Sequence, residues 1–274
     1  MTLRLERLSP AVGAVVEGVD LRAVDDQTVR KINEAWADHG VLFFRGQHLE
    51  PDELVDAARI FGEPEHFEMA PAVAGSDYVH HIHTDPPRRH GGASRWHSDA
   101  TWKPLPPRGS MLQAVALPPL GGDTLFASAN GAFESLSSGL QRYVGELTAT
   151  HFGGEALGRA GARVGLEIPD PVQHPVVRRH PVAALPCLYV NTVFTHHLDD
   201  VPRRESDALL PLLCDQFKDP ELQCRFRWEP GDIAVWDNRT VQHYAVPDYV
   251  TARSMHRVVL AGEPVHPWDP ASSR

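Results

Sequence analysis

From about residue 110 onward, most apolar residues of this chain occur in short runs that end at proline, glycine or aspartate. Such runs are typical of β-strands, because the chain has to turn at both ends of each one. We expect strands at the following segments: Ser110–Leu117, His174–Pro181, Cys187–Asn191, Gln223–Trp228, Asp232–Asn238 and Met255–Gly262.

Helices are expected early in the chain. Asp25–Gly40 has a capping aspartate, apolar residues at helical spacing and a terminating glycine, and Pro51–Gly62 has proline and acidic residues in its first turn. A short buried strand, "GVLFFRG", lies between them, and two later helices are expected at Gly131–Leu147 and Arg203–Phe217. Helices early and strands in most of the remainder predict an α+β fold that is mainly β, a jelly roll or barrel supported by flanking helices.

Neither a repeat nor a low-complexity linker divides the 274 residues, so we expect residues 1–274 to form a single domain. The net charge of -10 argues against nucleic acid or an anionic membrane as the main partner. Cys187, Cys214 and Cys224 show no CxxC spacing, which argues against a disulfide framework and fits a reducing cytoplasm. No run approaches the length of about 18 apolar residues that a transmembrane helix needs, so we predict a soluble cytoplasmic protein.

The pattern His-x-Asp occurs twice in a short stretch, as His83-Thr84-Asp85 and as His97-Ser98-Asp99. On an extended segment residues i and i+2 point to one face, so either pair could bind a metal from one side. Asp85 precedes two prolines, which remove hydrogen-bond donors and favour an irregular loop. We therefore predict that the first pair consists of solvated loop residues, and that His97 and Asp99 lie on a strand and bind a metal.

A metal needs at least one more protein ligand, and the sixteen histidines leave several candidates. His243 follows the predicted strand "DIAVWDN" after a short excursion of the chain, which favours it. The pair His196-His197 and the histidines His174 and His180 are alternatives that the residues alone do not rank.

Two arginines, Arg253 and Arg257, are four residues apart on a predicted strand and therefore share a face, where each could hold a carboxylate or sulfonate. Arg257 directly precedes the apolar run "VVL", where an unpaired charge would be costly. Thr124 follows the glycine turn "PPLGGD", and its hydroxyl could donate to a carboxylate.

The segments "WHSDATW", "GGDTL", "WDNRTVQHYAVPDY" and "RSMHRVVLAG", in this order, resemble the taurine dioxygenase and alkylsulfatase group of iron(II)/2-oxoglutarate-dependent oxygenases. The resemblance extends nearly end to end, from "GAVVEGVDLR" to "LAGEP". It implies a double-stranded β-helix core and a dioxygenase that hydroxylates a small anionic organic substrate. Fe(II), 2-oxoglutarate and O2 are then required, succinate and CO2 are released, and a dimer or tetramer is expected.

Carried over by position, the resemblance makes His97, Asp99 and His243 a facial triad that leaves three metal positions open. By the same resemblance 2-oxoglutarate binds the iron through its keto-acid end. Its distal carboxylate is then held by Arg253 and Thr124.

Arg257 matches the family's arginine for the anionic group of the substrate, and Phe194 matches an aromatic residue of the substrate pocket. Two other readings remain. A non-catalytic metal-dependent binding protein on the same fold would need a degraded triad or a missing Arg253, and neither is found. A zinc hydrolase could use the same triad but would leave Arg253 and Thr124 without a role.

The chain departs from taurine-specific relatives around the substrate. Phe67 and Ala70 stand where those relatives carry histidine and tyrosine, an asparagine is replaced near Ala93, and Ala100 follows the metal aspartate. A site that lacks hydrogen-bonding groups loses discrimination for the ligand they would hold. We therefore predict a larger or more apolar sulfonate, sulfate ester or carboxylate, such as an alkyl sulfate or aryloxyalkanoate, in place of taurine.

Overall fold

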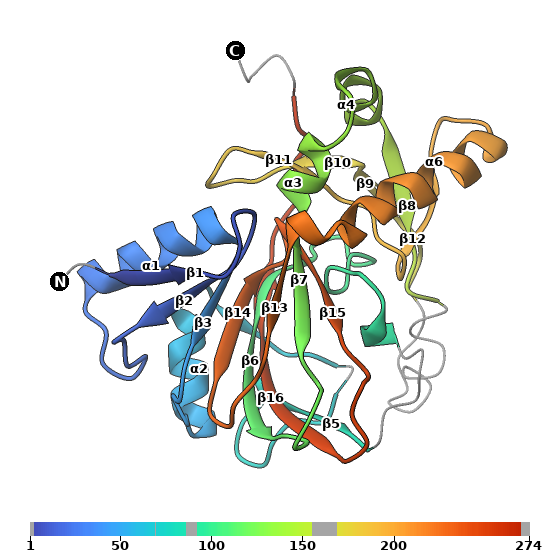
Figure 1. Ribbon diagram of the computed structural model, residues 1–274. Helices are drawn as coiled ribbons and strands as arrows, with labels where there is room; N and C mark the ends of the chain where they lie inside the picture. Colours follow the sequence, from blue (N-terminus) through green and yellow to red (C-terminus); the bar gives the residue numbers. More distant parts are fainter. Residues whose placement is uncertain (1–2, 69, 86–91, 155–168, 270–274) are drawn as a thin grey trace.

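The structure is a computed structural model, and it describes residues 3–68, 70–85, 92–154 and 169–269 (Figure 1). Most of its regular elements are strands, which confirms the mainly β class. The largest sheet has the order β1-β2-β3-β14-β6-β16-β4, with β5 also paired to β16. Its strands are β1 (Arg4–Arg7), β2 (Ala14–Glu17), β3 (Val41–Phe44), β4 (Pro64–Glu65), β5 (Val79–Thr84), β6 (Pro107–Ala116), β14 (Ile233–Asp237) and β16 (Arg253–Gly262).

A three-stranded sheet lies in front of the large one and is built from β13 (Gln223–Phe226), β7 (Thr124–Ser128) and β15 (Val241–Ala245) (Figure 1). Apolar side chains from both sheets form one buried cluster between them. Within it, the rings of Phe43 and Phe226 stack with centroids 4.0 Å apart. The two sheets therefore pack face to face, and inward residues of β6, β14, β16 and β15 share one interior.

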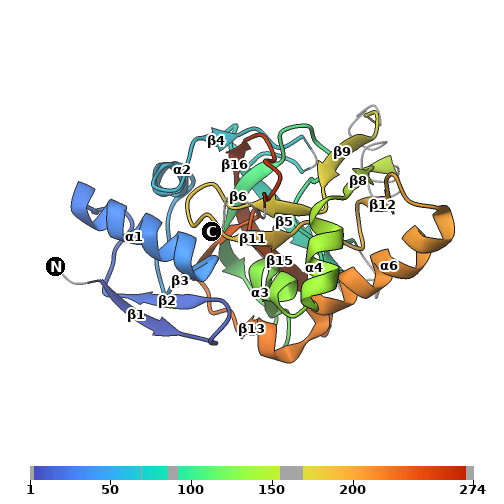
Figure 2. The ribbon, with the colours of Figure 1, turned by 90° about the horizontal axis from the view of Figure 1, so that it is seen from above.

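Helices α1 (Asp26–His39) and α2 (Pro51–Arg59) bury Trp36 and Leu54 in an apolar cluster that also contains Val235 and Val258 of the large sheet. The predicted cap is present, because the Asp25 side chain accepts from the backbone N–H of Thr28 at 2.7 Å. Viewed from above, α1 lies at one end of the molecule and α6 at the opposite end (Figure 2). The early helices thus cover the outer face of the large sheet and leave its inner face for the site.

The remaining elements form a second apolar cluster beside the two sheets. One sheet there has the order β12-β8-β9, and a hairpin pairs β10 with β11. These strands are β8 (Thr148–His151), β9 (Val172–Pro175), β10 (Val177–Arg179), β11 (Pro186–Leu188) and β12 (Thr195–Leu198). The helices and 3-10 turns are α3 (Ala129–Glu134), α4 (Ser138–Gly145), α6 (Arg203–Asp215), η1 (Gly92–Ser94), η2 (Gln216–Lys218) and η3 (Pro220–Leu222).

Two sequence predictions need correction here. The single helix expected over Gly131–Leu147 is wrong, because the chain forms α3 and α4, and the Ser137 side chain caps the second helix by accepting from Leu140. The single strand expected over His174–Pro181 is divided into β9 and β10, which pair with different strands. Among the described residues, no helix is both long and apolar enough to cross a membrane.

Candidate metal centre

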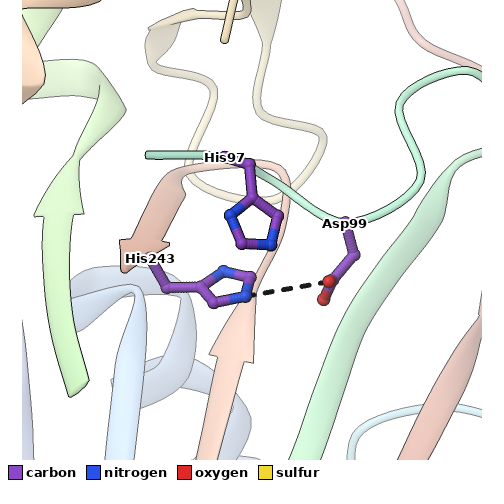
Figure 3. A group of neighbouring side chains, drawn as sticks. All are labelled: His97, Asp99 and His243. Carbon is purple, nitrogen blue, oxygen red and sulfur yellow. Dashed lines mark ion pairs between the residues drawn. The ribbon is translucent and has the colours of Figure 1, made fainter. Parts of the chain in front are cut away.

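Three side chains from two distant parts of the chain converge between the two sheets. His97, Asp99 and His243 each offer a ligand atom, and these atoms lie within 4.8 Å of one another (Figure 3). Two backbone hydrogen bonds join the histidines, from His97 N–H to the His243 carbonyl (3.2 Å) and from His243 N–H to the His97 carbonyl (2.9 Å). The triad predicted from the sequence is therefore brought together by a local pairing of β15 with the segment before Asp99.

The prediction that His97 and Asp99 lie on a strand is wrong. His97 forms only an isolated bridge to His243, and a turn begins at Asp99, with Ala100 in the left-handed region at φ 45°. Beyond His97 the segment pairs with no strand of the described residues, and it folds back instead of continuing in extended form. The turn, and not the alternation of a strand, aims the Asp99 carboxylate at His243.

The two oxygens of Asp99 have different surroundings. Oδ2 accepts from Ser110 Oγ at 3.0 Å and from Trp236 Nε1 at 3.2 Å, and it pairs with Arg257 Nη2 at 2.8 Å. Oδ1 lies 3.7 Å from His243 Nε2. Sequence reasoning missed Ser110 and Trp236; the detectable signal was a polar residue at the start of a buried strand and an indole two residues before Asn238.

The electrostatics suit a divalent metal. Burial lowers the pKa of His97, and burial lowers the pKa of His243 to about 3, so both imidazoles are neutral near pH 7. Burial alone would raise the pKa of Asp99, but the Arg257 guanidinium and the two imidazoles hold it well below its usual range. His97 Nδ1 faces the Arg95 carbonyl at 2.7 Å, which places its proton there and leaves Nε2 free to bind. Two neutral nitrogens and one carboxylate oxygen are the donor set of non-haem Fe(II) sites.

A second arginine, Arg253, lies on the same face of β16 as Arg257. Arg253 is buried, and its Nε and Nη2 have no hydrogen-bond partner among the described residues. Its guanidinium lies 5.8 Å from the centre of the Trp228 ring, and Trp228 Nε1 donates to Thr124 Oγ1 at 3.0 Å. Because an unpaired buried charge is costly, this cation is suited to an external anion. Trp228 was missed in the sequence, although it continues the alternating buried positions of β13.

The residues assigned to the substrate lie in different places. Arg257 lies over the Phe67 ring at 4.7 Å, and the rings of Phe194 and His97 are 6.4 Å apart. Ala100 belongs to a small apolar cluster with Trp102 and Phe194. Ala93 lies in η1 and is exposed. These placements put Phe67, Phe194 and Ala100 next to the triad or to Arg257, and they do not do so for Ala93.

His80 is a further residue that sequence reasoning missed. It is fully buried, its Nδ1 faces the Ala70 carbonyl at 3.1 Å, and its Nε2 accepts from the Phe67 backbone N–H at 3.0 Å. Burial lowers its pKa, which favours the neutral form that can donate through one nitrogen and accept through the other. His80 therefore fixes the segment that carries Phe67.

The other histidines considered from the sequence lie outside the triad. His83 belongs to β5, where it pairs with Ser254, so its prediction as a loop residue is wrong; its side chain is exposed and lies 3.3 Å from Asp85. Residues 86–91 of the expected loop lie outside the described residues. The remaining candidates have other partners: His174 faces the Lys103 carbonyl, His180 faces Asp237, and His197 faces Asp199 while lying against His196.

A family model described as "Taurine catabolism dioxygenase TauD, TfdA family" matches residues 4–259. The chain belongs to this family. The alkylsulfatase of Acinetobacter baylyi is 34% identical to it over 276 residues, covering 95% of this chain and 86% of that protein. An alpha-ketoglutarate-dependent sulfate ester dioxygenase of Pseudomonas putida is 33% identical over 277 residues, covering 96% and 91%.

The fold of this taurine dioxygenase family member is also found in solved structures. The crystal structure of a taurine dioxygenase from Burkholderia xenovorans matches with a TM-score of 0.85 and 33% identity, covering 97% of this chain and 93% of that one. The family resemblance and the dioxygenase class predicted from the sequence are therefore confirmed.

Proposed function

We propose that the protein uses Fe(II), 2-oxoglutarate and O2 to hydroxylate a small anionic organic molecule, with release of succinate and CO2. The observation that carries this proposal is the proximity of two neutral histidines and one ionised carboxylate, with ligand atoms within 4.8 Å. Family membership supports it independently. A non-catalytic binding protein is disfavoured, because none of the three ligand positions is degraded and Arg253 is present.

The metal would be held by His97 Nε2, His243 Nε2 and one oxygen of Asp99. When bound there, iron with 2-oxoglutarate supplies the oxidation chemistry. Arg253 would pair with the distal carboxylate of 2-oxoglutarate, which gives its buried nitrogens the partners they lack. Thr124 Oγ1 already accepts from Trp228, so its own hydrogen is available to donate to the same carboxylate.

The substrate would bind beside Arg257. Arg257 Nη2 contacts two groups of the protein, Asp99 Oδ2 and Ser110 Oγ. Arg257 Nε is buried without a partner among the described residues and can donate to a substrate anion. The side chains around it are apolar or aromatic, with Phe67 under the guanidinium and Phe194 beside His97. These residues position an anionic head and surround the reacting carbon with apolar groups that exclude water.

We assign the substrate class to alkyl sulfates or related sulfonates and carboxylates with an apolar body. The support is the apolar character of Phe67 and of the cluster formed by Ala100, Trp102 and Phe194. Similarity to an alkylsulfatase and to a sulfate ester dioxygenase points the same way. An aryloxyalkanoate is the second candidate, because an aromatic ring would pack equally well against Phe67 and Phe194.

Three further features belong to the same proposal. The two facing sheets would form a double-stranded β-helix, supported by their shared interior cluster and by the similarity to solved family members. Residues 1–274 would act as one dioxygenase domain, since the family match spans residues 4–259. A cytoplasmic homo-oligomer is proposed; three free, buried cysteines are compatible with a reducing compartment.

The direct test measures succinate formed from 2-oxoglutarate with iron and ascorbate, in the wild type and in His97→Ala. His83→Ala is the matched control, because it removes the exposed member of the other His-x-Asp pair. We expect His97→Ala to abolish turnover and His83→Ala to retain it; the reverse would refute the assignment. A panel of alkyl sulfates, alkanesulfonates, aryloxyalkanoates and taurine, scored by succinate release, then identifies the class. Turnover of taurine above all bulkier acids would contradict the substrate proposal.

A further inference from the structure

Among the described residues, the hydrogen-bond donors to the Asp99 carboxylate all contact one oxygen, Oδ2. Oδ2 accepts from Ser110 Oγ and Trp236 Nε1 and pairs with Arg257 Nη2, at 3.0, 3.2 and 2.8 Å. A carboxylate oxygen offers about two lone-pair sites, so three donors fill Oδ2 completely. Oδ1 is the oxygen that faces His243. The unequal surroundings leave a single oxygen for a metal.

Asn238 connects this arrangement to the backbone. Its Oδ1 accepts from the Asp99 backbone N–H at 3.2 Å and from Trp236 Nε1 at 3.1 Å, so the indole N–H is shared between the amide and the carboxylate. Asn238 is itself fixed, because its backbone N–H donates to the Arg108 carbonyl at 3.0 Å. One amide thus holds both the main chain of the metal-binding aspartate and a donor to its side chain.

The two neutral donors come from adjacent strands of the large sheet. Ser110 of β6 and Trp236 of β14 are direct partners in the antiparallel register, so both side chains project from the same face. Ser110 is fully buried and Trp236 is 3% exposed, which limits their freedom to reorient. Rigid strands are therefore the support for the carboxylate, whereas Asp99 itself lies in a turn.

We infer that Ser110, Trp236 and Asn238 are positioning residues that restrict Asp99 to one-oxygen ligation and so keep a coordination position open. This inference rests on the proposed metal centre. Three protein ligands leave three positions, of which chelation by 2-oxoglutarate needs two. If Oδ2 could also reach the metal, the third position would be lost to the carboxylate. Arg257 is also a donor to Oδ2, but the proposed function engages its Nε with the substrate, whereas the neutral donors have no assigned contact with the substrate and hold Asp99 whether or not substrate is bound.

The test uses metal-free full-length protein titrated with Co(II), followed by visible absorption, and then titrated with 2-oxoglutarate at saturating Co(II). Trp236→Phe keeps the ring and removes the N–H. Trp36→Phe is the matched control, because Trp36 is equally buried and its Nε1 donates to the Val235 carbonyl of the same strand at 3.1 Å. Neither titration measures turnover.

We expect Trp236→Phe to weaken Co(II) binding about tenfold to a hundredfold, as loss of a group that orients a metal ligand generally does, and to weaken 2-oxoglutarate binding at saturating Co(II). Trp36→Phe should change neither. The inference is overturned if both indole variants lose the same Co(II) affinity, or if 2-oxoglutarate binds Trp236→Phe as tightly as the wild type.

Two further variants keep the inference testable if Trp236→Phe does not fold. Ser110→Ala removes another donor to Oδ2, and Asn238→Ala removes the acceptor for the Asp99 backbone N–H. Each variant should bind both Co(II) and 2-oxoglutarate more weakly than the wild type. His97→Ala separates the two proposals. If it abolishes Co(II) binding, the metal centre stands even where the positioning variants behave like the wild type.

Discussion

Arg253 offers the sharpest quantitative test, because its replacement should change stability and ligand affinity in opposite directions. In the ligand-free protein it is a buried guanidinium, 7% exposed, with two nitrogens that have no partner among the described residues. A buried unsatisfied donor costs about 1–3 kcal/mol. Arg253→Met keeps most of the apolar contact with Trp228 and removes that cost, so the free energy of unfolding without ligand should rise by about 1 kcal/mol.

The affinity for 2-oxoglutarate should fall in the same variant. A hydrogen bond to a charged group contributes about 1.5–3 kcal/mol, and 1.4 kcal/mol corresponds to about tenfold in Kd. We therefore expect a loss of about tenfold to a hundredfold, measured by calorimetry on the Co(II)-loaded protein. Stability is measured by urea unfolding of the metal-free protein.

Arg178→Met is the matched control for Arg253→Met. Arg178 is 3% exposed, but it lies over the Tyr189 ring at 4.9 Å and 3.9 Å from the Glu263 carboxylate. Arg178 Nε is also buried without a partner among the described residues, but Nη2 lies near the Glu263 carboxylate, so removal of this side chain should destabilise the protein. It should leave 2-oxoglutarate affinity unchanged, because Arg178 lies outside the site. If Arg253→Met destabilises the protein like Arg178→Met, or binds 2-oxoglutarate as the wild type does, the unpaired-cation argument is refuted.

Three other predictions concern neighbouring groups. Trp228→Phe keeps the ring beside Arg253 and removes the donor to Thr124, so a 2-oxoglutarate titration should show weaker binding with unchanged Co(II) affinity. Phe67→Ala removes a cation–π contact of about 0.5–2 kcal/mol, so steady-state kinetics should show a higher substrate KM with a smaller effect on kcat; an unchanged KM would place the substrate elsewhere. Burial holds the pKa of His151 far below its ordinary value. The unfolded chain therefore binds a proton that the folded one does not, and the unfolding free energy of the metal-free protein should fall as pH drops below about 6.5. His151→Phe should reduce that slope by up to about 1.4 kcal/mol per pH unit, and an equal slope in both proteins would contradict the assignment.

The helices near the start were predictable because their signals are local. The Asp25 cap and the terminating glycine act within one turn of the helix, and α1 and α2 lie close to the expected bounds. The division between α3 and α4 depends equally on a local signal, the Ser137 cap, which the apolar periodicity obscured. The loop assignment of His83 failed for another reason: β5 exists because it pairs with distant β16, and Pro86 limits only the residue that precedes it.

At the site, residue types were predictable and geometry was not. His97, Asp99 and His243 follow from ordered motifs, but the turn at Ala100 and the pairing of His97 with His243 depend on contacts between segments far apart in sequence. The roles of Ser110 and Trp236 also could not be predicted, because their polar atoms donate to Asp99, whose position depends on those long-range contacts. Alternation along a strand shows which face a side chain takes, and says nothing about which distant group will meet it.

The two arginines of β16 could bind two different anions, 2-oxoglutarate and the substrate. Arg253 and Arg257 project from the same face, four residues apart, which on a strand corresponds to a separation of about 13 Å. Their internal partners differ, since Arg257 is already paired with the Asp99 carboxylate, whereas Nε and Nη2 of Arg253 have no hydrogen-bond partner among the described residues. An added anion relieves the cost of an unpaired buried charge more at Arg253 than at Arg257, so the dicarboxylate 2-oxoglutarate should bind to Arg253. Arg257, partly neutralised and lying on Phe67, is suited to a weakly hydrated anion such as an organosulfate, whose head it can hold without surrendering Asp99. In the proposed function, charge and geometry on a single strand would therefore place the co-substrate and the substrate at different ends of one site.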